Sequence, residues 1–312
     1  MNPSNVVVWW HPSAELVSSF ASFAQQKDHK MLDLGPGWLR EVRQQVTPSF
    51  AREASRLFDG EAGKQVHQVV LPLVRATPDG LDVAAFLDWA EGLPIGDLYE
   101  RIVPLLPEGR GSGLLRDLGS LRDRYVRLLR TWNDSYFRHV DPALLAGLAA
   151  ERESMAARVG TMPDVDLVEL ATHGIRLEPP FDAQAIVLVP QWHDRPYNDH
   201  LKLHELTLLM YPAEVVPTPD GEPPTTLRRI TAALSDPSRL RILRLLSGGT
   251  RSLTEVAREL GLAQSTVHHH LIALRAAGLT RTHYSSGTNR YSLRPGALDQ
   301  IGAELRAFLS VD

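Results

Sequence analysis

One stretch near the carboxyl end constrains the fold of this 312-residue chain more than any other. It reads SLTEVARELGLAQSTVHHHLIALRAAGLT over residues 252–280, two helical patterns joined by a short turn. Ser252 and Glu255 have the spacing of a capping box, with Thr254 as the alternative cap, and Gly261 suits the turn. The apolar positions expected to face inward are Val256, Ala257 and Leu260 in the first helix and Val267, Leu271 and Leu274 in the second. The pattern predicts a helix-turn-helix.

The residues before this stretch predict two more helices. TLRRITAALS, residues 226–235, has a helical pattern, and Asp236 followed by Pro237 is a typical helix start. The second of these helices has Leu240, Leu243 and Leu246 on one side and ends at the glycine pair 248–249.

The second helix of the helix-turn-helix has a polar outer face. When Val267 and its apolar partners are buried, Ser265 and His269 project in nearly the opposite direction. Gln264, Ser265 and Thr266 form the first turn, which is the part of such a helix that meets base edges in the major groove of DNA. We therefore expect residues 264–277 to be a recognition helix.

Two short alternating runs, TRTHY and YSL, flank a turn rich in Ser, Gly and Asn and predict a β-hairpin, or wing. Arg281 lies at its base and Arg290 beside its tip, where each is expected to contact the DNA backbone or the minor groove. Arg275, at the end of the recognition helix, is a third candidate DNA contact.

Charge along the chain supports this interpretation. From residue 224 onward there are twelve arginines and six acidic residues, a net charge of about +6, which leaves about −10 for residues 1–223. Residues 260–298 contain no Asp or Glu. A basic tail on an acidic body suits a polyanionic partner such as double-stranded DNA.

After Pro295 the chain predicts a last amphipathic helix. Leu298, Ile301, Leu305 and Leu309 share one face of it. This apolar stripe needs a partner, either the helix that begins near Thr226 or a second subunit.

Residues 226–309 resemble the ArsR-type family of bacterial winged-helix regulators. The motifs are LSDPSRLRILRLL, the helix-turn-helix quoted above and the wing, in that order. The resemblance implies a homodimer formed through the first and last helices of this domain, which acts on a two-fold symmetric operator, usually as a repressor. It also implies that Gln264, Ser265, Thr266, His268 and His269 read bases, while His270 matches a histidine that precedes Leu in the family.

This chain departs from the family in two respects. Metal-sensing members have paired cysteines on the helix of Val256 and Ala257, whereas this chain has no cysteine at all, so thiolate-based sensing is not inherited. Typical members have about a third of this length. The additional amino-terminal region resembles the domain of unassigned function of some extended members, which leaves room for an unknown small-molecule effector.

The amino-terminal region predicts helices with a small strand pair. Residues 12–160 are mostly helical in pattern, with an apolar seam over 113–137 that faces the core or a partner subunit. AIVLVP at 185–190 and LTLLMY at 206–211 predict the strands. The fold class is therefore α+β and mainly helical, with domains at 1–212 and 226–312 joined by a Pro-rich linker at 213–225.

Without cysteine, a metal site would need histidines and carboxylates. No segment has the pattern of a signal peptide or the roughly 20 apolar residues of a membrane span, so we expect a cytoplasmic protein with no membrane partner and no cofactor. We also expect no enzyme activity.

Two other functions remain open. The amino-terminal domain is an enzyme or a metal- or ligand-binding domain if His193, His200 and His204 share a site, although Pro196 and Asn198 favour a loop there. Alternatively, the winged helix makes protein contacts only. Three weaker features are given structural interpretations: His268–His270 fan out too far to chelate one ion, residues 109–113 (GRGSG) suit a linker between helices, and Trp9 and Trp10 suit core packing.

Overall fold

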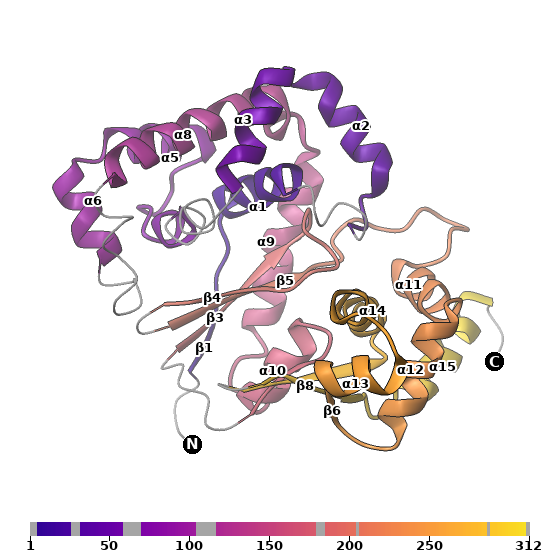
Figure 1. The fold of residues 1–312 in the computed structure, drawn as a ribbon. Coiled ribbons are helices and arrows are strands. Elements are labelled where there is room, and N and C mark those ends of the chain that lie inside the picture. Colours follow the sequence, from indigo (N-terminus) through magenta and orange to yellow (C-terminus); the bar gives the residue numbers. More distant parts are fainter. Residues whose placement is uncertain are drawn as a thin grey trace. The chain divides into compact units, whose positions relative to one another are not determined.

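A computed structural model describes residues 5–25, 32–58, 70–103, 117–178, 185–203, 206–285 and 288–309 (Figure 1). The chain forms two compact units. The helical unit comprises residues 7–156 and 183–215, and the winged-helix unit comprises residues 1–6, 157–182 and 216–312. No helix of the described residues is long and apolar enough to cross a membrane.

The helical unit has one extensive core between helices and a sheet. Its helices are α1 (Pro12–Ala24), α2 (Gly35–Gln45), α3 (Pro48–Phe58), α5 (Val83–Gly92), α6 (Ile95–Ile102), α8 (Leu118–Ser135), the 3₁₀ turn η2 (Phe137–His139) and α9 (Pro142–Ala156). Residues 70–75 are also helical. The aromatic rings of Phe20, Phe23 and Trp132 pack together at its centre.

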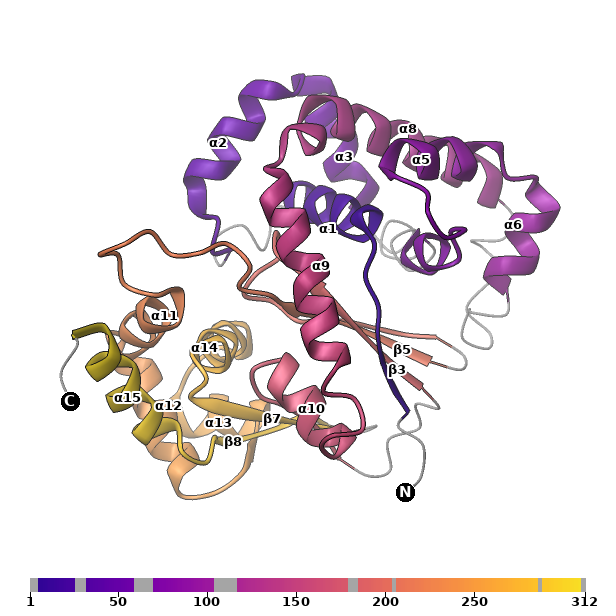
Figure 2. The same cartoon turned by 180° about the vertical axis from the view of Figure 1, so that it is seen from behind.

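The predicted strand pair is confirmed, as part of a larger sheet. β3 (Ala185–Gln191) and β5 (Leu206–Pro212) are parallel, and β1 (Val6–Val8) and β4 (Asp199–Lys202) complete the order β1-β3-β5-β4. Alternate residues such as Val187 and Met210 belong to the helix-covered core. On α9, Glu151 accepts a hydrogen bond from the hydroxyl of Tyr211, and Figure 2 shows α9 crossing this sheet. Both faces are therefore covered, which explains the continuous apolar strands.

The seam over 113–137 lies on α8 and faces the core of its own unit. Tyr125, Leu128 and Trp132 are each at most 2% exposed. The core interpretation therefore holds for the described part of this seam, which begins at residue 117. Trp9 and Trp10 also pack against the same core. The GRGSG segment and Leu114 lie outside the described residues.

The winged-helix unit contains every element predicted from residue 226 onward. Its helices are α11 (Thr225–Leu234), α12 (Pro237–Ser247), α13 (Leu253–Leu260), α14 (Gln264–Ala276) and α15 (Ala297–Leu309). The wing is β7 (Thr280–Tyr284) paired with β8 (Arg290–Leu293), and β8 also pairs with β6 (Arg251–Ser252). The predicted fold class, α+β and mainly helical with a carboxyl-terminal winged helix-turn-helix, is confirmed.

Local signals at the helix ends act as predicted. The carboxylate of Asp236 accepts from the backbone of Ser238 at 2.7 Å and begins α12. The Ser252 and Glu255 capping box is complete, so Ser252 rather than Thr254 caps α13. Gly261 ends that helix with φ of 66°, a left-handed conformation that glycine adopts without steric cost.

The buried face of α12 differs from the prediction. Ile242 and Leu246 are buried, whereas Leu240 is 47% exposed. A helix has 3.6 residues per turn, so residues spaced three apart, such as Leu240, Leu243 and Leu246, do not stay on one face. Leu240 therefore lies outside the face that Ile242 and Leu246 share.

A segment from the middle of the chain belongs to the winged-helix unit. Helix α10 (Asp164–Ala171) and strand β2 (Ile175–Leu177) precede β3 in the sequence, yet β2 pairs with β7 and extends the wing sheet to the order β2-β7-β8-β6. The predicted division into 1–212 and 226–312 is therefore corrected: residues 157–182 fold with the carboxyl-terminal domain. Strand pairing between distant segments leaves little local trace in a sequence.

Candidate nucleic-acid interface

Helix α14 presents its polar residues to solvent. Val267, Leu271 and Leu274 are buried at 2% exposure or less and attach the helix to the core of the unit. The predicted base-reading residues, Gln264, Ser265, Thr266, His268 and His269, are all exposed. Their exposure is what base reading requires, and their contact with bases stays a prediction.

The amino terminus of α14 has no side-chain cap. Its N-cap residue is Ala263, whose methyl group accepts no hydrogen bond. The first backbone N–H groups of a helix have no partner within the helix, and they carry partial positive charge. This turn of α14 therefore offers donors to an anion beside the exposed polar side chains.

His270 has a structural environment, as the sequence suggested. Its side chain is only 15% exposed, and Nδ1 accepts a 3.4 Å hydrogen bond from Nε of Arg239. Burial lowers its pKa, and the nearby carboxylate of Asp236 acts in the opposite direction. His270 thus ties α14 to the start of α12, while His269 on the same helix is exposed.

Arg290 lies at the surface beside the amino end of α13. Its side chain is 49% exposed, and it donates to the carbonyl of Thr250 at 3.1 Å while lying 3.5 Å from the carboxylate of Glu255. A cation with this exposure keeps most of its hydration and remains able to meet a phosphate.

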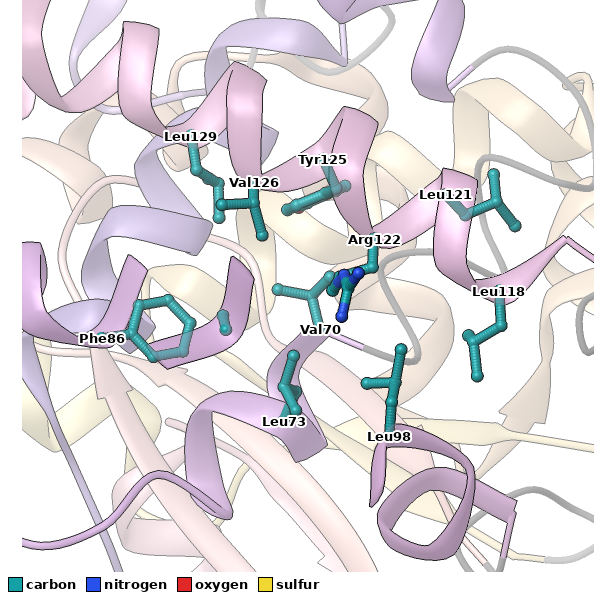
Figure 3. Close-up of a pocket in the computed structure, with 11 residues that line it drawn as sticks. Val70, Leu73, Phe86, Leu98, Leu118, Leu121, Arg122, Tyr125, Val126 and Leu129 are labelled. Atoms are coloured by element: carbon teal, nitrogen blue, oxygen red, sulfur yellow. The ribbon is translucent and has the colours of Figure 1, made fainter. Parts of the chain in front are cut away.

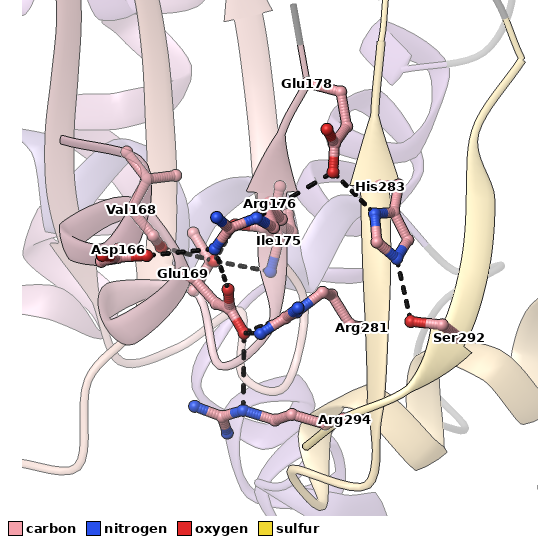
Figure 4. A network of polar contacts seen from close by, with 11 residues as sticks. Asp166, Val168, Glu169, Ile175, Arg176, Glu178, Arg281, His283, Ser292 and Arg294 are labelled. Atoms are coloured by element: carbon pink, nitrogen blue, oxygen red, sulfur yellow. Dashed lines mark hydrogen bonds and ion pairs between the residues drawn. The ribbon is translucent and has the colours of Figure 1, made fainter. Parts of the chain in front are cut away.

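Arg281 is engaged by a carboxylate from α10. Its Nε donates to Oε1 of Glu169 at 2.8 Å, and its side chain is only 21% exposed. Figure 4 shows Arg176 and Arg294 converging on the same carboxylate, at 3.1 Å and 3.7 Å. From the sequence, Arg281 is expected to contact DNA from the base of the wing. Within the unit, the carboxylate of Glu169 competes with DNA for this guanidinium.

Arg275, which the sequence proposes as a DNA contact, is buried in the structure. The residue is 6% exposed, and Nη1 donates to the backbone carbonyl of Thr172 at 2.9 Å. Burial lowers its pKa to about 10, which still leaves it charged at neutral pH. Arg275 therefore fastens α14 to the turn between α10 and β2, a neighbour that the local sequence does not reveal.

Sequence reasoning missed the acidic side of this interface. Glu169 lies 112 residues before its partner Arg281, and Glu178 lies 105 residues before His283, from whose Nδ1 it accepts a 2.7 Å hydrogen bond. The one usable signal was a short helix closed by Gly174 and followed by alternating residues, which is typical of a helix-strand unit.

The histidines considered for an enzyme site have different environments. His193 is fully buried: Nδ1 donates to Glu15 at 2.5 Å, and Nε2 accepts from the hydroxyl of Tyr136 at 2.8 Å. Burial raises the pKa of Tyr136 to about 12, so its hydroxyl stays protonated. His200 is exposed on β4, which is a strand rather than a helix, and His204 lies outside the described residues.

No group of three or more His, Asp or Glu residues with metal-binding geometry occurs within the described ranges. In the network around His193, this histidine and Glu15 are fully buried and Tyr136 is half-buried, and the network links α1, the end of α8 and the chain after β3. Its contacts are those of a structural polar network in a core.

An apolar pocket lies between α5, α6, α8 and residues 70–75 (Figure 3). Its cavity is small, about 20 Å³, and its walls include Phe86, Leu98 and Leu129. Arg122 borders it and donates to the carbonyl of Leu93. Tyr125 also lines it, and its buried hydroxyl has no hydrogen-bond partner among the described residues.

Comparisons with known proteins converge on the winged helix. A family model described as a helix-turn-helix domain matches residues 234–283. The HTH-type transcriptional regulator CmtR of Mycobacterium tuberculosis is 37% identical over 89 residues, which cover 28% of this chain and 75% of CmtR. The arsenical resistance operon repressor of Staphylococcus xylosus is 35% identical over 79 residues, which cover 25% of this chain and 76% of that repressor.

Among solved structures, the homodimeric winged helix-turn-helix DNA-binding domain of a Mycobacterium bovis protein is 25% identical. The match covers 27% of this chain and 79% of that one, with a TM-score of 0.23. The similarity to the two regulators spans about three quarters of their length, and the family model matches the residues that form α12, α13, α14 and most of β7. Through its carboxyl-terminal part, the chain belongs to the ArsR family of winged helix-turn-helix, DNA-binding transcriptional regulators.

Proposed function

We propose that this regulator acts as a homodimeric repressor that inserts α14 into the major groove of a two-fold symmetric operator. The observation that carries the proposal is the exposed polar face of α14 beginning at Gln264, above an uncapped helix start. Amide, hydroxyl and imidazole groups match the donors and acceptors of base edges. Related proteins that carry the name repressor support the sign of regulation.

The last helix supports the dimer. On α15, Leu298 is 67% exposed, Leu305 is 44% exposed and Leu309 is 56% exposed. Ile301 packs on the core of its own unit, so only part of the predicted stripe is used within one chain. A cluster of exposed leucines on one helix is typical of a subunit interface. We propose that a second copy covers it, with two α14 helices about 34 Å apart on DNA.

Mobility-shift and footprinting assays test DNA binding, with DNA from the region upstream of the gene that encodes this regulator. The proposal predicts a symmetric footprint and an affinity that falls steeply with salt, because phosphate contacts release counterions. Absence of any duplex complex at low salt would contradict it. A reporter that becomes more active when the regulator is removed indicates repression, whereas lower activity indicates activation.

The double variant Leu305→Glu, Leu309→Glu tests the dimer separately. Charged residues at a dimer interface oppose its burial, so light scattering should detect monomers and cooperative operator binding should disappear. The matched variant Leu240→Glu changes an exposed leucine on α12 and should leave the mass unchanged. A dimer that survives the double variant would rule out this interface.

We further propose that the pocket of Figure 3 opens to bind a small apolar effector with one acceptor oxygen, which would reach the buried Tyr125 hydroxyl. The unpaired Tyr125 hydroxyl supports this, because a buried donor without a partner costs about 1–3 kcal/mol. Burial raises the pKa of Tyr125, so it remains a donor. Thermal shift with octanoate, and with octylamine as a control of equal apolar length, tests the preference for an acceptor.

The Tyr125→Phe variant has an opposite effect on the empty and the occupied protein. It should raise the melting temperature without ligand, because an unpaired hydroxyl is removed, and reduce the shift with octanoate. Tyr211→Phe is the matched control, because the Tyr211 hydroxyl already donates to Glu151 and its loss should lower the melting temperature. Equal octanoate and octylamine shifts would reject the acceptor preference.

A further inference from the structure

The edge of the wing is closed by a strand from the middle of the chain. β2 runs parallel to β7, with Ile175 opposite Thr282 and Leu177 opposite Tyr284. The amide of Thr282 donates to the carbonyl of Gly174 at 2.7 Å, and the amide of Glu178 donates to the carbonyl of Tyr284 at 2.9 Å. Without β2, the backbone groups on this side of β7 would form an open sheet edge.

Gly174 permits this close pairing. Its φ is +125°, and a Cβ at this position would lie 2.7 Å from the backbone oxygen of Thr280. A side chain is therefore excluded both by the backbone conformation and by the approach of β7. The glycine is needed because β2 docks here.

Glu169 neutralises arginines at the base of the wing. Its side chain is 8% exposed and contacts Arg281 from β7, Arg294 after β8 and Arg176 from β2. Asp166 lies 3.0 Å from Arg176, and Glu178 lies 4.0 Å from it. Three arginines thus face three carboxylates, so the base of the wing has little net positive charge to offer to phosphates (Figure 4).

We infer that α10 and β2 form a built-in clamp that positions the wing for DNA binding, with Glu169 as the positioning residue. The inference rests on the proposed DNA-binding function. A wing held by a fourth strand loses less conformational freedom when it meets DNA, which favours binding. Arg281 contributes through Glu169, by fixing β7, rather than through a phosphate.

The sign of one charge change separates this inference from direct phosphate contact. If Glu169 only shielded Arg281, the Glu169→Gln variant would free a cation and tighten DNA binding with a steeper salt dependence. If Glu169 positions the wing, the same variant weakens operator binding, by about tenfold, although the protein becomes more positive. Operator affinity is measured by fluorescence anisotropy over a series of salt concentrations.

A double-mutant cycle identifies the partner. Glu169→Gln, Arg281→Gln and the double variant should each lose a similar factor, because either single change already breaks the clamp. Asp166→Asn is the matched control: it makes the same charge change on α10, but within the described residues its exposed carboxylate pairs with Arg176 and not with Arg281. Its operator affinity should stay within about twofold. Tighter or unchanged binding by Glu169→Gln would overturn the inference.

Amide hydrogen exchange tests the clamp without DNA. Two variants are used so that the result does not depend on the stability of either one. In Glu169→Gln and in Gly174→Ala, the amides of Thr282 and Glu178 should exchange faster, while amides within α13 keep their protection. Unchanged exchange at Thr282 in both variants would also overturn the clamp. If wild type binds no DNA, the proposed function fails, but the exchange result still decides whether the clamp exists.

Discussion

Helix α14 and the wing sheet belong to the same compact unit, yet their polar groups have opposite surroundings. The outer residues of α14, including Ser265 and His269, are exposed. The arginines at the base of the wing are instead neutralised by carboxylates from α10. The difference teaches that basic residues near a predicted recognition helix can be engaged within the protein: the outer side chains of α14 are exposed to solvent, whereas the arginines at the base of the wing are held by carboxylates.

The largest expected effect tests whether the exposed face of α14 reads bases. Replacing both Ser265 and His269 with alanine should weaken specific operator binding by about 3 kcal/mol, because each good base contact contributes about 1–3 kcal/mol. The melting temperature should barely change, since both side chains are exposed. Anisotropy with operator and with scrambled DNA measures it. Unchanged operator affinity would mean that another face of α14 meets DNA.

Arg275 tests whether the buried contacts near the base of the wing serve stability rather than DNA binding. The Arg275→Met variant should lower the free energy of unfolding by about 2 kcal/mol, because the carbonyl of Thr172 loses its buried donor. DNA affinity of the folded variant should remain close to that of wild type. Urea unfolding followed by circular dichroism gives the first quantity and anisotropy gives the second. A large loss of affinity with full stability would restore Arg275 as a DNA contact.

His173 connects the clamp to pH. It lies in the turn between α10 and β2, where burial lowers its pKa to about 4, with Arg229, Arg275 and Arg294 acting in the same direction. Since its pKa is near 6.5 in an unfolded chain, the unfolded state takes the proton first, and stability is lost as pH falls from about 6.5 toward 4.

The His173→Asn variant removes this titration, and asparagine tolerates the positive φ of 57° at this position. At pH 5 it should be about 1–2 kcal/mol more stable relative to wild type than it is at pH 7.5. Urea unfolding at the two pH values measures the difference. A stability difference that is independent of pH would show that folding does not lower the pKa of His173, and would contradict this prediction.

Arg290 should give the smallest effect. Its exposed guanidinium suits one phosphate contact, so Arg290→Ala should weaken binding to all DNA sequences by about 0.5–1 kcal/mol and reduce the salt slope by about one. Affinities for operator and scrambled DNA at several salt concentrations check this. Loss on one sequence class alone would indicate that Arg290 reads bases or groove shape.

The winged helix was predictable because its signals are local. Each signal affects only the few residues around it. Examples are the helix starts at Asp236 and Ser252, the turn at Gly261 and the apolar stripe through Val267. The strands after residue 184 were also predictable from β-branched runs. Their parallel pairing and the two additional strands were not, because pairing depends on partners far away in the chain.

The candidate site was predictable only in part, for the same reason. Helical periodicity correctly oriented the exposed residues of α14, but the charge pattern made Arg275 a candidate DNA contact although its side chain is buried. A charge count treats every arginine alike, whereas Glu169 and the carbonyl of Thr172 are about a hundred residues away from the arginines they engage. Charge tells which kind of partner a region attracts, and burial decides which side chains are available to it.

The participation of β2 in the wing bears on how this regulator can be dissected. A fragment that starts in the Pro-rich linker would lack both α10 and β2, leaving β7 with unsatisfied backbone groups along one margin and Arg275 without its acceptor. Such an isolated DNA-binding fragment would be prone to self-association through the open sheet edge at β7. A usable minimal fragment needs residues 157–182 supplied as well, for instance by fusing that segment ahead of the linker.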